Sequence, residues 1–179
     1  MPLQDGQRAI RLVRAHAAMW GLEPARIGFM EFSAAGHLGA SLVANFDRRL
    51  VAPKDDADRQ SARPDYVVLA YPVVSMVAGI AHPDSRANLF GDDPSRDLVE
   101  RCSPDLHVTA AAPPVFIVAA DDDAVVSAEN WMRFYTALKK AGAEAGAELH
   151  VFKEGGHGFA LAHAPDLPVA GWPRLCEAG

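Results

Sequence analysis

Side chains that could together carry out nucleophilic catalysis lie in three short segments of the chain. Ser33 is followed by small residues, three aspartates occur in a row at Asp121–Asp123, and His157 lies within residues 154–159 (EGGHGF). A serine hydroxyl becomes a strong nucleophile when a histidine takes its proton and a carboxylate orients the imidazole. The chain therefore carries the groups of a Ser-His-Asp triad, provided that the fold brings them together.

The segment around Ser33 has the composition of a tight turn from a strand into a helix. Residues 26–31 (RIGFME) form a short apolar run of strand length, and the residues from Ser33 to Asn45 are rich in Ala, Gly and Leu. Such a turn lifts a serine hydroxyl out of the sheet and points backbone amides of the helix at a bound carbonyl. A serine at this place can also serve only as a helix cap, and the segment alone favours neither interpretation.

The remaining elements are expected to bring the aspartates and the histidine to the edge of the sheet where Ser33 lies. Apolar runs predict strands at residues 26–31, 66–74, 115–120 and 149–152, and helical periodicity predicts helices at 5–20, after Ser33 to 45, and at 129–141. This alternation indicates an α/β fold with a mostly parallel sheet and helices on both faces. The aspartates follow the third strand and His157 follows the fourth, so all three groups come after strand ends.

Three motifs resemble those of the acetyl esterase and acetylxylan esterase branch of the α/β hydrolases, carbohydrate esterases related to prolyl oligopeptidase. Residues 31–37 (EFSAAGH) are similar to the family's G-F-S-A-G-G-H elbow. Residues 123–127 (DAVVS), then Glu129-Asn130 and 134–138 (FYTAL), are similar to its D-x-x-V-P, E-N and F-Y-x-A-L elements. The G-G-H-G-F motif is intact at 155–159. The similarity covers nearly the whole chain, and the order Ser, Asp, His is the α/β-hydrolase order.

The resemblance implies a role for each of these residues. Ser33 is the expected nucleophile, His157 the general base, and Asp123 the acid, because Asp123 stands three residues before Val126 as the family element requires. Asp122 is the alternative acid, and Asp121 is expected to belong to a solvated turn. The backbone amide of Ala34 is expected to donate to the oxyanion of the reaction.

The chain departs from the family pattern in two respects. The first and second glycines of the elbow are replaced by Glu31 and Ala35, and Glu31 adds bulk and a carboxylate near the nucleophile. The H-G-G-G-type loop, which supplies half of the family's oxyanion hole, does not precede the elbow. Residues 1–179 are therefore expected to form a single catalytic domain with a reduced α/β-hydrolase fold of about four strands, lacking the usual N-terminal strands. The nucleophile strand would then lie at an open edge, which predicts a homo-oligomer or a chain cut from a longer protein.

The expected activity is hydrolysis of short-chain carboxylic esters, with acetyl groups on xylan or xylo-oligosaccharides as the substrate class that the resemblance implies. One alternative is a catalytically weak or inactive fragment, since loss of one oxyanion donor lowers rates by about 10² to 10³. Another is a peptidase or a dienelactone-type hydrolase that uses the same triad, which the elbow does not exclude. No metal or organic cofactor is implied.

Composition limits the other partners of the protein. The 179 residues are half apolar, the formal net charge is −6, and the basic residues are not clustered, so nucleic acid and anionic lipid are not expected to bind. The sequence has neither a signal-peptide pattern nor an apolar run of membrane-spanning length, and it leaves the compartment open.

Several other residue types that can carry chemistry are given structural interpretations. His37 is expected to pack or hydrogen-bond on the helix after Ser33, and the other histidines are scattered without metal-ligand spacing. Trp20, Trp131 and Trp172 are expected in the core, and Cys102 and Cys176 as free thiols. Residues 54–64 are polar without apolar periodicity and are expected to form a surface loop.

Overall fold

In the part of the chain that the structure describes, the sheet is parallel throughout, which agrees with the predicted mostly parallel sheet. The computed structural model describes residues 2–143, 146–161 and 166–178. Within this part the four strands are β1 (Gly28–Phe32), β2 (Tyr66–Ala70), β3 (Val115–Ala120) and β4 (Ala147–Phe152), in the spatial order β1-β2-β3-β4. Each neighbouring pair is parallel, and β1 lies at one end of the sheet. All four strands are confirmed, with boundaries that differ by a few residues from the predicted ones.

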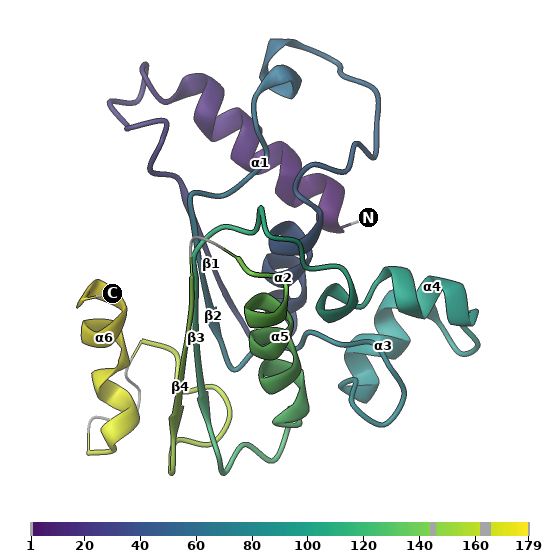
Figure 1. The fold of residues 1–179 in the computed structure, drawn as a ribbon, viewed down its shortest axis with the longest axis vertical. Coiled ribbons are helices and arrows are strands. Elements are labelled where there is room, and N and C mark those ends of the chain that lie inside the picture. Colours follow the sequence, from purple (N-terminus) through teal and green to yellow (C-terminus); the bar gives the residue numbers. More distant parts are fainter. Residues whose placement is uncertain (1, 144–145, 162–165, 179) are drawn as a thin grey trace.

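Helices cover both faces of the sheet, which confirms the predicted α/β class. The helices are α1 (Pro2–His16), α2 (Gly36–Asn45), α3 (Pro83–Phe90), α4 (Arg96–Arg101), α5 (Glu129–Lys140) and α6 (Trp172–Ala178). Figure 1 shows α2 and α5 on one face of the sheet and α6 on the other.

Alternation of side chains along the central strands explains this arrangement. In β2, Val67 and Leu69 pack in a core cluster with residues of α2 and α5, whereas Val68 and Ala70 pack with Trp172 of α6. Successive side chains of a strand point to opposite faces, so a strand that is apolar at every position needs cover on both sides.

The predicted second strand is too long, because β2 ends at Ala70 rather than Val74. Tyr71 has a φ of +39°, which takes the chain out of the extended conformation. The apolar residues that follow are buried all the same. Val73 packs in a separate cluster with Met76, Val99 and Val126, beneath the α3–α4 excursion. The apolar run continues past the end of the strand because its last residues belong to this separate cluster.

The polar segment predicted as a surface loop is held against α1. It contains a 3₁₀ helix at Asp56–Arg59, and Asp58 is buried. Arg8 of α1 donates to Asp55 at 2.7 and 2.6 Å and to Asp58 at 2.8 Å. Arg14, six residues further along α1, donates to the carbonyl of Arg63 at 2.6 Å. Arg8 and Arg14 of α1 thus hold in place a loop whose own sequence shows no periodicity.

We expect the substitution Arg8→Gln to lower the urea midpoint of unfolding near pH 7 and to have little effect near pH 2. The hydrogen bond from Arg8 lowers the pKa of Asp55 to about 2, whereas an ordinary aspartate has a pKa of about 3.9. A carboxyl group with a depressed pKa stabilises the fold fully above its ordinary pKa. That stabilisation is lost as the pH falls from about 4 toward about 2.

Arg59→Gln is the matched control for this measurement. Arg59 pairs with Asp56 at 3.2 Å, but the two side chains are 78% and 94% exposed, so the pair is expected to contribute little at any pH. An Arg8→Gln effect of the same size at both pH values would contradict the ion-pair explanation.

Two of the three tryptophans lie in the core as predicted. Trp131 and Trp172 are buried, whereas the prediction for Trp20 is wrong, because this side chain is 54% exposed and stacks on His16. The helix α1 ends at His16, so Trp20 does not share its buried face. Among the helices of the described residues, none combines the length and apolar character needed to cross a membrane.

Candidate active site

The structure brings Ser33, Asp123 and His157 together at the carboxyl-terminal edge of the sheet, the lower end of the strands in Figure 1. The Oγ of Ser33 lies 2.7 Å from Nε2 of His157. The Nδ1 of His157 lies 2.8 Å from Oδ2 of Asp123. Because a carboxylate only accepts, Nδ1 carries the proton of a neutral imidazole, and Nε2 accepts from the serine hydroxyl.

Ser33 lies in a strained turn that joins β1 to α2. Its φ is +52°, a left-handed conformation that costs a non-glycine residue about 1–3 kcal/mol. The amide of Val73 donates to the Ser33 carbonyl at 2.9 Å and helps to hold the turn. A Cβ on Gly36 would lie 2.7 Å from Cα of Pro72, so only glycine lets the start of α2 approach the segment after β2. The helix-cap interpretation does not account for the strain, since a helix N-cap adopts ordinary extended backbone.

The two elbow positions that lack glycine are accommodated differently. Ala35 has a φ of −69°, which any residue adopts, so a glycine is not needed there. Glu31 is half-buried, and burial raises the pKa of its carboxyl group. A Cβ on Gly39 of α2 would lie 3.6 Å from Cβ and Cγ of Glu31 and 2.6 Å from Cδ2 of Leu69. Gly39, which the sequence analysis missed, therefore lets α2 pack closely on Leu69 of β2, whereas Glu31 is at ordinary van der Waals distance.

The Asp123 carboxylate is held in a buried setting by its own turn. Its side chain is 2% exposed, and Oδ1 accepts from the amides of Val125 and Val126 at 2.9 and 3.0 Å. The other oxygen faces His157. Asp121 and Asp122 are exposed, and neither of them faces the imidazole; Asp122 accepts instead from Gly155 and Gly156.

Glycines shape the turn that carries His157. Gly156 and Gly158 have φ values of +61° and +85°, which L-residues with side chains rarely adopt. A Cβ on Gly155 would come within 3.1 to 3.2 Å of Ala120 and Val169. The G-G-H-G motif therefore has a physical cause, since each glycine permits a conformation or an approach that aims the imidazole at Ser33.

Tyr71 is a site residue that the sequence analysis missed. Its ring lies edge-on to the imidazole of His157, with centroids 4.8 Å apart, and also packs on Phe159. Its hydroxyl accepts from the amide of Ala160 at 3.1 Å, and burial raises the pKa of the phenol. The apolar run around Tyr71 predicted a strand interior, and the available signal was Pro72, which has no N–H to donate to a strand ladder.

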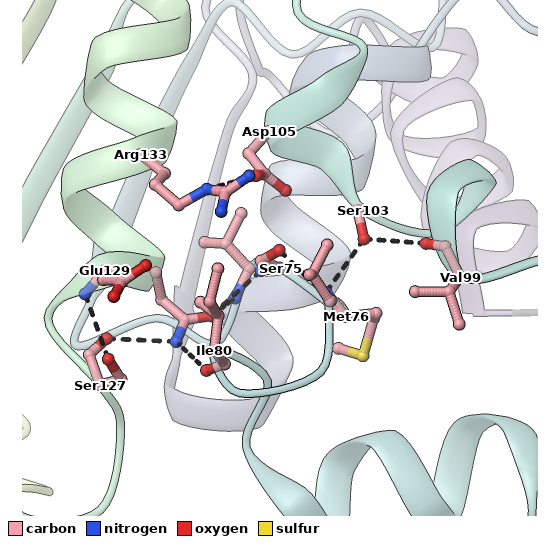
Figure 2. A network of polar contacts seen from close by, with 12 residues as sticks. Ser75, Met76, Ile80, Val99, Ser103, Asp105, Ser127, Glu129 and Arg133 are labelled. Atoms are coloured by element: carbon pink, nitrogen blue, oxygen red, sulfur yellow. Dashed lines mark hydrogen bonds and ion pairs between the residues drawn. The ribbon is translucent and has the colours of Figure 1, made fainter. Parts of the chain in front are cut away.

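A buried network joins the segment after β2 to the turn that carries Asp123. The Oδ1 of Asn130, in α5, accepts from the amides of Val74 and Ser75 at 2.9 and 3.0 Å. Its Nδ2 donates to the carbonyls of Ile80 and Ser127 at 2.9 and 3.1 Å. Figure 2 shows Ser75, Ile80 and Ser127 gathered around the start of α5. A fully buried amide with all its partners satisfied makes this connection rigid.

The other residues singled out near the site have simpler surroundings. The Nε2 of His37 donates to the carbonyl of Cys102 at 2.7 Å, and burial lowers the pKa of this imidazole, which confirms a structural role. Ala34 is exposed in the 3₁₀ turn before α2, where the first amides have no partner within the helix. Within residues 2–143, 146–161 and 166–178, no group of three or more His, Cys, Asp or Glu side chains is arranged to hold a metal ion.

Comparisons with known proteins agree with the motif resemblance. The chain is 33% identical over 171 residues to endo-1,4-beta-xylanase B of Butyrivibrio fibrisolvens, a match that covers 96% of the chain and 26% of that protein. It is 32% identical over 163 residues to acetylxylan esterase of Xylanibacter ruminicola, covering 89% of the chain and 31% of that protein. The chain thus spans about a quarter to a third of these curated relatives.

Solved structures share the fold. An acetyl ester-xyloside bifunctional hydrolase from Caldicellulosiruptor lactoaceticus superposes with a TM-score of 0.90 at 41% identity, over 98% of this chain and 63% of that one. Thermogutta terrifontis esterase 2 superposes with a TM-score of 0.75 at 31% identity, over 98% of this chain and 62% of that one. The predicted resemblance to acetylxylan esterase-like α/β hydrolases is confirmed. The BD-FAE family model matches residues 1–138, more than half of the 179 residues, and the chain therefore belongs to the BD-FAE family.

Proposed function

We propose that the protein hydrolyses short-chain carboxylic esters, with Ser33 as nucleophile, His157 as general base and Asp123 as the acid of a catalytic triad. One observation carries this proposal, namely the hydrogen-bonded chain from Ser33 Oγ through both ring nitrogens of His157 to Asp123, with contacts of 2.7 and 2.8 Å. The contact between Ser33 and His157 is within the range in which a base can take the proton of a nucleophile, and the contact between His157 and Asp123 is a hydrogen bond that orients the base.

The reaction would proceed through an acyl-enzyme. His157 Nε2 takes the Ser33 proton as Oγ attacks the ester carbonyl, while Asp123 stabilises the imidazolium that forms. The Ala34 amide donates to the oxyanion of the tetrahedral intermediate. The protonated imidazole then gives its proton to the departing alcohol, which leaves the acyl group on Ser33. A water molecule, activated by the same imidazole, hydrolyses the acyl-enzyme and restores the serine.

Acetyl groups on xylan or xylo-oligosaccharides are the proposed substrates. This assignment is supported by the similarity to the Xylanibacter ruminicola acetylxylan esterase and to the Caldicellulosiruptor lactoaceticus acetyl ester-xyloside hydrolase. The open position of the elbow, where Ala34 and Ala35 are exposed, is compatible with a substrate as wide as an oligosaccharide. A peptidase or dienelactone-type hydrolase would use the same three side chains, so the experiment must include their substrates.

The test is the intact mass of the protein during reaction with 4-nitrophenyl acetate. We expect the chain to gain the mass of one acetyl group transiently and Ser33→Ala to gain none. Release of acetate from acetylated xylo-oligosaccharides, with no cleavage of peptide or dienelactone substrates, would support the substrate class. A folded chain that neither acquires an acetyl group nor releases acetate would instead be an inactive fragment.

We also propose that residues 1–179 act as one catalytic domain and that copies of the chain associate through β1. Among the described residues β1 pairs only with β2, and its Met30 side chain is 45% exposed. An unpaired strand edge is a template for pairing with another strand. Sedimentation velocity over a range of concentrations tests this, and a monomer at every concentration would contradict it.

A further inference from the structure

We propose that Asp122 is a positioning residue for His157. Its carboxylate holds the Gly155–Gly156 turn in the position in which the imidazole contacts both Ser33 and Asp123. This role rests on the proposed function, in which His157 is the general base. The two adjacent aspartates then have different roles, since Asp123 contacts the imidazole and Asp122 contacts the backbone that carries it.

The position of Asp122 explains why such a contact is needed. The register of β3 and β4 ends with the pair Ala120 and Phe152. One further ladder bond follows, from the amide of Asp121 to the carbonyl of Phe152 at 2.7 Å. Beyond that bond the two chains diverge into separate turns. The Asp122 side chain replaces the ladder there, because it connects the turn after β3 to the turn after β4.

The geometry of the contact allows one carboxylate to fix two successive residues of the turn. A single oxygen, Oδ1 of Asp122, accepts from the amide of Gly155 at 3.0 Å and from the amide of Gly156 at 2.7 Å. Hydrogen bonds to an ionised acceptor are about twice as strong as those between neutral groups. Both donors lie directly before His157, and glycine backbones are the most flexible in the chain when nothing holds them. Loss of this contact would therefore allow the Gly155–Gly156 segment to move, and the orientation of the imidazole depends on that segment.

The far side of His157 is held independently. The amide of Ala160 donates to the Tyr71 hydroxyl at 3.1 Å, and the ring of Tyr71 packs against the imidazole. Removal of the Asp122 carboxylate would free one side of the turn and leave the other attached. We therefore expect misaligned catalysis rather than an unfolded loop, and since Asp122 is exposed, little packing is lost with its side chain.

The test compares Asp122→Ala, Asp122→Asn and Asp121→Ala in hydrolysis of 4-nitrophenyl acetate. A displacement of about 1 Å in a catalytic group costs about 10²-fold, so we expect Asp122→Ala to lower kcat by about 10- to 100-fold with KM unchanged. Asp122→Asn keeps an oxygen that accepts from both amides and should recover kcat to within a few fold of the parent. Asp121→Ala removes a neighbouring exposed carboxylate that does not contact the turn, and should behave as the parent.

Amide hydrogen exchange of Gly155 and Gly156 gives a second measurement that does not depend on activity. Faster exchange in Asp122→Ala, with parent-like exchange in Asp122→Asn and Asp121→Ala, is the expected result. The proposal is overturned by unchanged kcat and exchange in Asp122→Ala, by an equal loss in Asp121→Ala, or by the absence of rescue in Asp122→Asn. If the parent itself is never acylated, the proposed function fails, and the exchange data alone decide whether Asp122 holds the turn.

Discussion

Ser33→Ala is expected to lower the rate of 4-nitrophenyl acetate hydrolysis by at least about 10³-fold, because the group proposed to form the acyl-enzyme is removed. Alanine cannot donate to His157 Nε2, which accepts from the Ser33 hydroxyl at 2.7 Å. Steady-state rates of the parent and the variant, with folding checked by circular dichroism, measure the effect. The strained φ of +52° is retained in the variant, so the fold should change little.

Two further variants make this result specific. His157→Ala should lower the rate about as much as Ser33→Ala, and the double variant should be no slower, since members of a triad act as a unit. Ser41→Ala replaces another serine, located in α2 away from the imidazole, and should retain the parent rate. A Ser33→Ala variant that keeps most of the activity would mean that another group is the nucleophile.

Asp123→Asn is expected to lower kcat by about 10⁴-fold while the protein remains folded. The Val125 and Val126 amides donate to Oδ1 and would keep the carboxamide oxygen on their side. The amide nitrogen of the asparagine would then face His157 and donate to Nδ1. The imidazole would carry its proton on Nε2 instead, where it can no longer accept from Ser33.

Asp121→Asn is the control for loss of a negative charge close to the site. Asp121 is exposed and is not bonded to the imidazole, so this variant should keep kcat close to the parent value. The dependence of kcat/KM on pH, measured for the parent and both variants, reports whether the base still titrates. If Asp123→Asn and Asp121→Asn had equal, small effects, the assignment of Asp123 as the acid would be wrong.

The fold could be predicted largely because its signals are local and redundant. Strands β2 and β3 are apolar at consecutive positions, which only a strand covered on both faces tolerates, and the structure has them at the centre of the sheet. The strand ends were less predictable. The apolar run after Ala70 continues because Val73 belongs to a separate buried cluster, so hydropathy does not show where the hydrogen-bonded ladder stops.

The candidate site, too, could be predicted from the sequence only in part. The sequence by itself determined the three residue types, their order and their places after parallel strands, because parallel strands bring their carboxyl ends to one edge. It also carried the glycines around His157, whose positive φ values only glycine adopts readily.

Only the tertiary structure decided which aspartate faces the imidazole, and what holds that imidazole in place. His157 is 34 residues from Asp123 and 124 from Ser33 along the chain, and the directions of three successive side chains in a turn depend on its dihedral angles. Tyr71 and Gly39 were missed for the same reason, since each acts on a residue remote in sequence, through a ring contact or through space left for a helix. Local pattern specifies the elements, whereas contacts between turns arise from packing of the complete sheet.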